Sequence, residues 1–444
     1  MSVQQHPPIY RRSDVETLPA NRFEGDLFDR EKLADRLTGF FDRLPDGAVL
    51  AIDSPWGEGK TWFGKRWRAK LTDQNYRTAY VDCFDKDYME DPFSMIASEL
   101  IALAKGSKTE IKTKLREGGM KLGAALLPAA AKLTVGALAH WAVGNAEIGT
   151  EAAKKISEGF NKNVGESLEK LVAKRFEDYE ENAKTVASFK AALTDLAAEG
   201  DKPIIIFLDE LDRCRPDFAV KTIERIKHFF EAPKVIFVVL LNRRQLEAAI
   251  HGMYGSEVNA EAYIGKFVQL SLTLPKVTSL DGHAQDDNRR HCGATLERFG
   301  FAESPARNTF VMTMGMMASA FGLSLRDVER AATLYSFAQP EDSWRLAWPI
   351  TIKLTNPELF ARILANDHAA HREAYQLLSQ KAASAVDISD ELKLYAEIHN
   401  CASSGFGNAL ATEQGRMLSG QGILAGPKAL FEQMFKRIDL SIAK

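Results

Sequence analysis

The stretch "DSPWGEGKTWF" (residues 53–63) directly follows the apolar run "AVLAID" (48–53), and it decides the fold of this chain. It matches the phosphate-loop pattern G-x-x-x-x-G-K-[ST] except at Ser54, which stands where the first glycine is usual. In such loops, consecutive backbone N–H groups point at a phosphate beside a helix N-terminus. The first glycine mainly shapes the turn after the strand, so a small residue with negative φ can replace it. The sequence therefore predicts a phosphate-binding loop.

Most positions of this loop have an expected nucleotide contact. Lys60 is expected to reach the β- and γ-phosphates, and the Thr61 hydroxyl is expected to hold Mg²⁺. Gly57 and Gly59 can adopt the positive φ that a tight turn needs. A chance match in a glycine-rich turn is the competing interpretation, which the strand before the loop and the helix after it disfavour. The predicted nucleotide-contacting residues are Ser54, Pro55, Trp56, Gly57, Glu58, Gly59, Lys60, Thr61 and Trp62.

A pair of acidic residues ends a second apolar run, "KPIIIFLDE" (202–210). The Asp209 carboxylate is expected to bind Mg²⁺ through water, and the Glu210 carboxylate to polarise the attacking water. Carboxylates at the C-terminal edge of a parallel sheet lie where ligands usually bind in α/β proteins. The alternative is that Asp209 only caps the helix that follows. We favour the catalytic interpretation.

Three further polar residues are candidates for contact with the γ-phosphate. Asn242 ends the apolar run 234–242 and is expected to sense the γ-phosphate or its water; its alternative role is to form a turn. Arg213 and Arg326 are expected to stabilise charge, because a guanidinium can bind two phosphate oxygens at once. An ion pair with Asp212 or Asp217 is the alternative for Arg213. For Arg326 the alternative is a solvated helix face.

Apolar runs alternate with stretches of helical spacing, which predicts an α/β fold. Continuous Val, Ile and Leu runs indicate a parallel sheet covered on both faces. A helix is expected over 29–44 with Asp29 as its cap, and the chain becomes helical from about residue 285. The expected strands are 48–53, 76–84, 202–210, 234–242 and 266–274.

The spacing of these elements also predicts the domain organisation. Thr61 and Asp209 lie too far apart in the sequence for a simple strand–helix–strand–helix–strand unit, so the segment between them must contain an insert. The expected parts are an irregular segment (1–25), a core (26–104 and 201–280), a helical insert (105–200), a small helical lid (281–340) and a C-terminal helical region (341–444).

These motifs resemble those of the KAP P-loop NTPases. The family loop G-x-W-G-x-G-K-[ST] is matched by Trp56, Gly57, Gly59, Lys60 and Thr61, and residues 209–213 resemble its D-[DE]-L-D-R motif. The chain departs from the family at Ser54 and at Asn242, where aspartate is frequent. The segments 80–93, 263–275 and 323–332 are also similar, so the resemblance covers roughly residues 26–335.

The resemblance implies an ASCE/STAND-like P-loop NTPase that uses ATP and Mg²⁺. It places Arg326 in a sensor-2-like position and implies hydrolysis that drives conformational change in a bacterial complex, with a homo-oligomer or an effector protein as partner. Some such NTPases accompany phage exclusion, so antiphage defence is a hypothesis. One alternative is a nucleotide-binding switch or scaffold with slow hydrolysis. The other is a nucleic-acid-stimulated ATPase, because residues 60–70 are basic and aromatic. Its tryptophans are better explained as core.

Composition limits the classes of partner and compartment. A formal net charge of -3 gives no global attraction to nucleic acid or to anionic membrane. The four cysteines lie far apart, which disfavours a zinc site or a secreted disulfide framework. The first residues contain no apolar signal segment, so we expect a cytoplasmic protein with reduced thiols.

Members of the resembled family often carry transmembrane helices between the two motifs, and the segment 121–144 occupies that position here. Pro128, Lys132 and His140 interrupt it, and an interior lysine costs about 2.5–3.5 kcal/mol on membrane insertion. We therefore expect a buried or partner-facing helix pair rather than a membrane anchor. If the chain does bind a membrane, this segment is the candidate.

One further cluster, His368 and His371 beside Asp367 and Glu373, has spacing that could hold a metal ion. A solvated helix face is the interpretation we favour for it. The sequence contains no H-E-x-x-H motif and no Ser-His-Asp arrangement. Any nuclease or membrane effector is therefore expected on another polypeptide.

Overall fold

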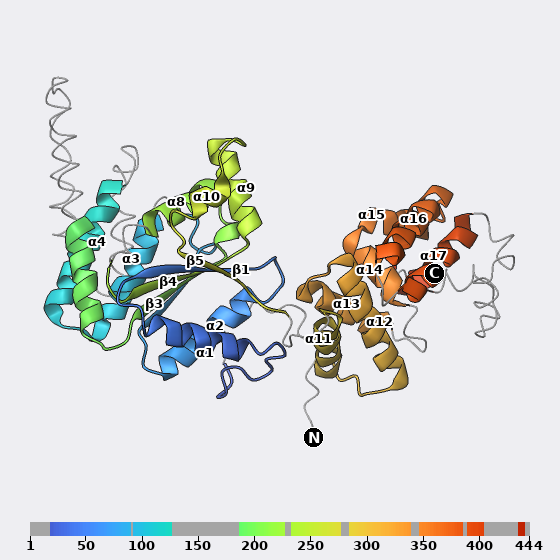
Figure 1. The fold of residues 1–444 in the computed structure, drawn as a ribbon, viewed down its shortest axis with the longest axis horizontal. Coiled ribbons are helices and arrows are strands. Elements are labelled where there is room, and N and C mark those ends of the chain that lie inside the picture. Colours follow the sequence, from blue (N-terminus) through green and yellow to red (C-terminus); the bar gives the residue numbers. More distant parts are fainter. Residues whose placement is uncertain are drawn as a thin grey trace, which may run out of the picture.

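The structure is a computed structural model. It shows a lobe built on a β-sheet and a lobe built only of helices (Figure 1). The residues that it describes are 18–89, 92–126, 186–226, 232–276, 284–338, 346–384, 389–403 and 434–439.

In the described part of the chain the sheet has five strands, and every strand pair in it is parallel. Its order is β2-β3-β4-β1-β5. Each strand lies inside one of the predicted apolar runs, so the predicted parallel α/β sheet is confirmed. The strands are β1 (Ala48–Asp53), β2 (Thr78–Asp82), β3 (Ile204–Asp209), β4 (Val235–Leu241) and β5 (Leu270–Thr273).

The order of the strands brings the two predicted motifs together. β4 lies between β1, which leads into the loop at 53–63, and β3, which ends at Asp209. The register pairs Asp53 with Leu241 and Asp209 with Leu240, so the two acidic residues end their strands at nearly the same level. The carboxyl ends of the strands therefore form one edge with the loop and the acids side by side.

Both faces of the sheet are covered by helices because successive residues of a strand point to opposite faces. In β1, Leu50 and Ile52 join one apolar cluster, whereas Val49 and Ala51 join the other. The first cluster includes residues of α1 (Arg30–Phe41) and α2 (Lys60–Asp73), which Figure 1 shows on one side of the sheet. The helices that contribute to the second cluster are α3 (Pro92–Leu103), α4 (Thr109–Leu126), α8 (Pro216–Ile226), α9 (Arg243–Tyr254) and α10 (Ala260–Ile264).

The described parts of the segment 105–200 are helical. α4 is followed by residues that the structure does not describe, and helical structure is described again over 186–198. Phe189 from this second part lies edge-on to Phe93 of α3, with ring centroids 5.5 Å apart. Most of the candidate membrane segment 121–144 is outside the described residues. Among those that are described, no helix is both long and apolar enough to cross a membrane.

The second lobe has an apolar core of its own. Phe310 stacks on Tyr335 with ring centroids 4.0 Å apart, and Trp348 is buried nearby in the same cluster. The helices are α11 (Ala284–Arg298), α12 (Pro305–Phe321), α13 (Leu325–Ala338), α14 (Ala347–Thr355), α15 (Pro357–Leu364), α16 (His368–Ser384) and α17 (Ser389–Ser403).

The predicted cap of α1 is only partly right. Asp29 does precede the helix, but its backbone is left-handed (φ 52°) and its side chain accepts no capping hydrogen bond. Asp26 instead accepts the N–H of Glu31 at 2.9 Å. The left-handed turn at Asp29 rotates its side chain out of capping position, which the sequence pattern alone does not reveal.

Candidate nucleotide-binding site

The loop between β1 and α2 has the backbone that its glycines predict. Gly57 and Gly59 have φ of 86° and 82°, and Ser54 lies outside the positive-φ region. Ser54 is buried, and its N–H donates to the carbonyl of Leu241 at 3.1 Å, which ties the start of the loop to β4. A serine thus fills the first-glycine position without strain.

Lys60, the first residue of α2, lies folded against the loop. Its Nζ donates to the carbonyl oxygens of Ser54 at 2.6 Å and Pro55 at 3.1 Å. Burial lowers its pKa, while the nearby carboxylates of Asp212 and Asp209 act in the opposite direction. The ammonium therefore lies among anionic groups, and it would exchange carbonyl oxygens for phosphate oxygens when a nucleotide binds.

Asp209 is at the centre of the candidate site, with only 2% of its surface exposed. Burial raises the pKa of its carboxyl, whereas the nearby Thr61 hydroxyl and the hydrogen bonds from the Tyr80 hydroxyl and the Glu210 N–H lower it. The Tyr80 bond is 2.6 Å and the Glu210 bond 2.8 Å. The two predicted metal ligands, Thr61 and Asp209, are therefore neighbours. Tyr80 was missed because a tyrosine in an apolar strand gives no functional signal by itself.

Glu210 follows β3 with a left-handed backbone (φ 58°). Its carboxylate forms an ion pair with Arg213, with Nη2 and Oε1 3.0 Å apart. Arg213 therefore does form an ion pair beside the site, as its alternative expected, but with Glu210 rather than with Asp212 or Asp217. The left-handed residue begins a 3₁₀ turn, Leu211–Arg213, that places the arginine over the preceding acid.

Trp56 lies at the rim of the site and is 44% exposed. Its indole N–H donates to Oδ2 of Asp212, which joins the loop to the turn after β3. The other carboxylate oxygen of Asp212 is buried without a hydrogen-bond partner among the described residues.

Asn242 lies between the loop and the acids, at the end of β4. It precedes α9, and its side chain makes no capping hydrogen bond, whereas its carbonyl accepts the N–H groups of Gln245 and Leu246. The neighbouring contact is made by Asp53, which accepts the N–H of Arg243 at 2.9 Å. These backbone bonds suit the alternative of a turn, and the sensor role of Asn242 stays a prediction.

The helical lobe reaches the loop through the start of α13. The backbone N–H of Arg326 donates to the carbonyl of Gly57 at 3.1 Å. A Cβ on Gly57 would lie 2.6 Å from Oγ of Ser324, so only glycine fits at this contact. Arg330 pairs instead with Asp327 at 3.2 Å and is largely exposed. Of the two arginines on this helix, Arg326 is thus the one whose backbone touches the loop.

A buried arginine on the other side of the loop was not predicted. Arg30 is 2% exposed, and its Nη2 donates to the carbonyl of Glu58 at 2.9 Å. The Glu58 carboxylate pairs with Lys276 at 2.7 Å. An arginine at the start of an amphipathic helix is usually a surface residue, so this contact does not follow from the sequence pattern.

The basic, aromatic stretch after the loop is mainly core, as expected. Phe63 and Trp67 are fully buried, and Trp67 packs among aromatic rings of the sheet and α1. Trp62 lies edge-on to Phe23 and beneath the guanidinium of Arg66. The predicted contact of Trp62 with a nucleotide stays a prediction.

The residues present suit a nucleotide and a magnesium ion. Mg²⁺ prefers hydroxyl and carboxylate oxygens, which Thr61 and Asp209 supply side by side. Lys60 brings a cation to the N-terminus of α2, where an anionic phosphate is favoured. The site therefore combines an anion-binding end and a cation-binding end.

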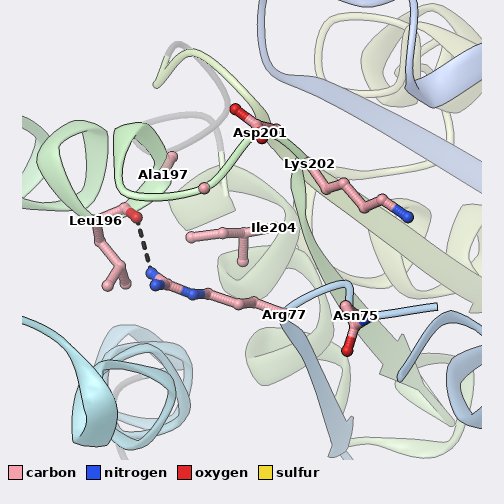
Figure 2. Close-up of a pocket in the computed structure, with 8 residues that line it drawn as sticks. Asn75, Arg77, Leu196, Ala197, Asp201, Lys202 and Ile204 are labelled. Carbon is pink, nitrogen blue, oxygen red and sulfur yellow. Dashed lines mark hydrogen bonds between the residues drawn. The ribbon is translucent and has the colours of Figure 1, made fainter. Parts of the chain in front are cut away.

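A pocket of about 220 Å³ lies elsewhere, at the opposite edge of the sheet (Figure 2). Ile204, the first residue of β3, lines it together with Arg77, which directly precedes β2. Arg77 donates to the carbonyl of Leu196 at 2.9 Å and pairs with Glu199 at 3.2 Å. Its charge is thus satisfied by the protein, and the pocket is separate from the candidate nucleotide site.

In the histidine cluster of the second lobe, the predicted solvated face is found at His368 and Glu373 but not at His371. His371 is fully buried, and its Nδ1 lies 3.0 Å from Nδ1 of His399. The Trp348 indole N–H donates to Nε2 of His399 at 2.7 Å. Neutral His399 therefore carries its proton on Nδ1 and donates it to His371. The described residues contain no group of three metal-binding side chains.

Known proteins resemble parts of this chain. The "Phage T7 exclusion protein" of Escherichia coli (strain K12) is 20% identical over 185 residues. That alignment covers 40% of this chain and 24% of the relative, so the chain matches about a quarter of the relative's length.

Two solved structures of Aeropyrum pernix proteins are similar at 12% identity and a TM-score of 0.33. One is the ORC2 protein in ADPNP–ADP complexes, with 100% of this chain and 98% of that chain covered. The other is the ORC1 protein in complex with DNA, with 94% and 93% covered. A TM-score this low carries no information about the partners of this chain.

The family comparison is more extensive. The model of the "KAP family P-loop domain" matches residues 31–327 of the 444. That range includes the loop, all five strands and the start of α13. The chain therefore belongs to the KAP family of P-loop NTPase domains.

Proposed function

We propose that the chain binds ATP with Mg²⁺ and hydrolyses the γ-phosphate. The observation that carries this proposal is that the strand register brings the loop after β1, with Thr61 directly after its lysine, beside Asp209 at the end of β3. A hydroxyl and a carboxylate held together beside a lysine are what a magnesium–triphosphate group requires. The ion, when bound, would neutralise charge on the phosphates.

Each predicted residue then has a role that follows from its position. Lys60 leaves the carbonyls of Ser54 and Pro55 and pairs with phosphate oxygens. Glu210 orients the attacking water once its carboxylate is released from Arg213. The freed Arg213 is then available to stabilise charge on the γ-phosphate.

The helical lobe supports a coupling of hydrolysis to movement. Arg326 is the second residue of α13, and its backbone already touches Gly57. A guanidinium at this position can bind the γ-phosphate and lose that contact after hydrolysis. The lid would therefore respond to the state of the nucleotide, and a homo-oligomer or an effector protein would receive the change.

The test compares Lys60→Ala and Glu210→Gln with wild type and with Lys65→Ala, an exposed lysine on the same helix. Nucleotide affinity is measured with a fluorescent ATP analogue, and turnover by phosphate release with and without Mg²⁺. Lys60→Ala is expected to lose binding at least about tenfold. Glu210→Gln is expected to bind normally and lose turnover about 10²–10⁴-fold. Turnover of both variants at the wild-type rate would refute the proposal.

A nucleotide-dependent switch with slow hydrolysis is the second candidate. The Glu210–Arg213 ion pair favours it, because a paired carboxylate is a weaker base for water. The switch predicts tight ATP binding with a low turnover that Glu210→Gln hardly changes. A nucleic-acid-stimulated ATPase is less favoured because Phe63 and Trp67 are buried, and adding DNA or RNA to the same assay tests it.

Antiphage defence is a further proposal, supported by the similarity to a phage exclusion protein. The four described cysteines are all free thiols, which supports our proposal of a cytoplasmic location. Protection against phage is expected to be lost in a Lys60→Ala strain and kept in a Lys65→Ala strain. Equal plating of phage on both strains would contradict this role.

A further inference from the structure

We propose that Arg30 is a positioning residue that sets the peptide between Glu58 and Gly59 for phosphate binding. The role rests on the proposed nucleotide binding. Arg30 begins α1, outside the loop, and its Nη2 donates to the carbonyl oxygen of Glu58 at 2.9 Å. It is 2% exposed, so this contact is made away from water.

The geometry of a peptide bond gives this contact its effect. In a planar trans peptide the C=O and the following N–H point in opposite directions. A guanidinium that holds the Glu58 carbonyl outward therefore holds the N–H of Gly59 inward. Inward-pointing N–H groups are what a phosphate loop offers to the β-phosphate.

The guanidinium is itself held in place from several sides. A Cβ on Gly59 would lie only 2.7 Å from Nη1 of Arg30, so loop and arginine are in close contact. The cation lies over the ring of Phe28 at 4.8 Å from its centroid. Asp26 and Asp287 add favourable charge, the latter from α11 of the helical lobe. Arg30 therefore has little freedom to turn away.

Glu58 is fixed a second time, through its side chain. Its carboxylate pairs with Lys276, which lies three residues beyond the end of β5, at 2.7 Å. The peptide that Arg30 orients is thus clamped between α1 and the segment after the last strand. Among the described residues, no hydrogen bond or ion pair joins the side chains of Arg30, Glu58 or Lys276 to Lys60 or Asp209, so the effect of this clamp on nucleotide binding passes through the backbone.

The clamp also has a cost in stability. Nε of Arg30 and Oε2 of Glu58 are buried without a hydrogen-bond partner among the described residues. Burial lowers the pKa of Arg30 to about 10, so the side chain is still charged at neutral pH. Incompletely bonded buried groups weaken a fold. Their presence at the loop is explained if they order it for a ligand.

The experiment compares Arg30→Met with Arg36→Met, an exposed arginine on the same helix. Affinities for ATP, ADP and AMP are measured by competition with a fluorescent nucleotide, and folding by thermal denaturation. Arg30→Met is expected to lose affinity for ATP about tenfold or more. Its affinity for ADP is expected to fall by the same factor, because both nucleotides carry a β-phosphate. AMP affinity and the Arg36→Met chain are expected to change little.

Two further variants cover the case in which Arg30→Met does not fold. Arg30→Lys keeps the charge but not the planar donor group. It is expected to lose affinity for ATP and ADP by one common factor, while its melting temperature stays near that of wild type. Arg30→Ala leaves a cavity, in which added guanidinium ion is expected to restore part of the affinity where sodium chloride at equal ionic strength does not.

The outcomes separate the two proposals. A wild-type chain that binds no nucleotide overturns the proposed function together with this role. A wild-type chain that binds nucleotide, with Arg30→Lys and folded Arg30→Met or Arg30→Ala binding it equally well, overturns the role of Arg30 alone. Unequal losses for ATP and ADP would also contradict it, because they would indicate a contact with the γ-phosphate.

Discussion

The backbone N–H of Arg326 donates to the carbonyl oxygen of Gly57 at 3.1 Å, which joins the helical lobe to the phosphate loop. Both groups of this bond belong to the backbone, so the distance between α13 and the loop is set here by the main chain and not by a side chain. By the same trans-peptide geometry, the bond turns the N–H of Glu58 away from α13. The helical lobe thus holds the carbonyl of Gly57, and Arg30 holds the carbonyl of the next residue, Glu58.

A methyl group on Gly57 should force this contact apart. Its Cβ would lie 2.6 Å from Oγ of Ser324 and 2.9 Å from Cβ of Arg326, and φ of 86° is strained for alanine. Gly57→Ala is expected to destabilise the chain by more than about 1–2 kcal/mol, the cost of left-handed backbone alone. Urea denaturation measures it. Gly300→Ala, at φ 83° with open space around it, is the control; equal losses would argue against the contact.

Removing the Tyr80 hydroxyl should change the acidic side of the pH–rate profile of ATP hydrolysis. Tyr80 donates to Asp209 at 2.6 Å and thereby lowers the pKa of a carboxyl that burial raises. Without the donor this pKa rises, so a proton competes with Mg²⁺ at higher pH. As the pH is lowered, Mg²⁺-dependent turnover of Tyr80→Phe is therefore expected to fall at a higher pH than turnover of wild type does. In Tyr76→Phe, which loses a hydroxyl bonded to Asp42, the pH–rate profile should be unchanged.

Trp56 should report nucleotide binding by its fluorescence. Its indole is 44% exposed at the rim of the site and donates to Asp212. A nucleotide on the loop would change both its solvent exposure and this hydrogen bond. Titration with ATP is expected to shift tryptophan emission in wild type and in Trp62→Phe, but not in Trp56→Phe. A full response in Trp56→Phe would place the signal elsewhere.

The buried histidine pair should make the chain sensitive to mild acid. Burial lowers the pKa of His371 to about 4 and that of His399 to about 3. An unfolded histidine has a pKa near 6.5, so between these values the unfolded chain binds more protons. The contribution of the two neutral histidines to the free energy of unfolding is complete above about pH 6.5. It falls as the pH decreases from there towards their folded-state pKa values. The slope is at most about 3 kcal/mol per pH unit for two groups.

Urea denaturation between pH 7.5 and pH 5 measures this slope. His399→Gln removes one titrating group and is expected to flatten the dependence on pH, even though it lowers stability at pH 7.5. His368→Gln, on the exposed side of the same helix as His371, should leave the slope unchanged. A pH-independent free energy of unfolding in wild type would show that the pair does not stay neutral in the fold.

The backbone of the sheet was predictable because buried parallel strands leave an unmistakable pattern. The runs that became β1, β3 and β4 are apolar at nearly every position, and only a strand buried on both faces tolerates that composition. The closeness of Thr61 and Asp209 followed from the same reasoning, since the ends of parallel strands share one edge.

What the sequence did not reveal depends on long side chains and on local handedness. Arg30 is buried by contacts with residues far along the chain, and His371 is buried against α17, so neither follows from its own helix. The left-handed backbone at Asp29 removes its side chain from the capping position of α1, and the left-handed backbone at Glu210 brings Arg213 into an ion pair with Glu210. Single-residue changes of this kind have no periodicity, and pattern analysis cannot detect them.

The place of β1 in the sheet has a consequence for synthesis on the ribosome. Among the described strands its neighbours are β4 and β5, which come much later in the chain, at Val235–Leu241 and Leu270–Thr273. At typical rates of translation, on the order of ten to forty seconds pass before β4 emerges to pair with it. Throughout that interval the nascent chain contains the complete loop sequence without the sheet that shapes it. Truncation before residue 235 should therefore give a polypeptide in which the loop has no fixed conformation.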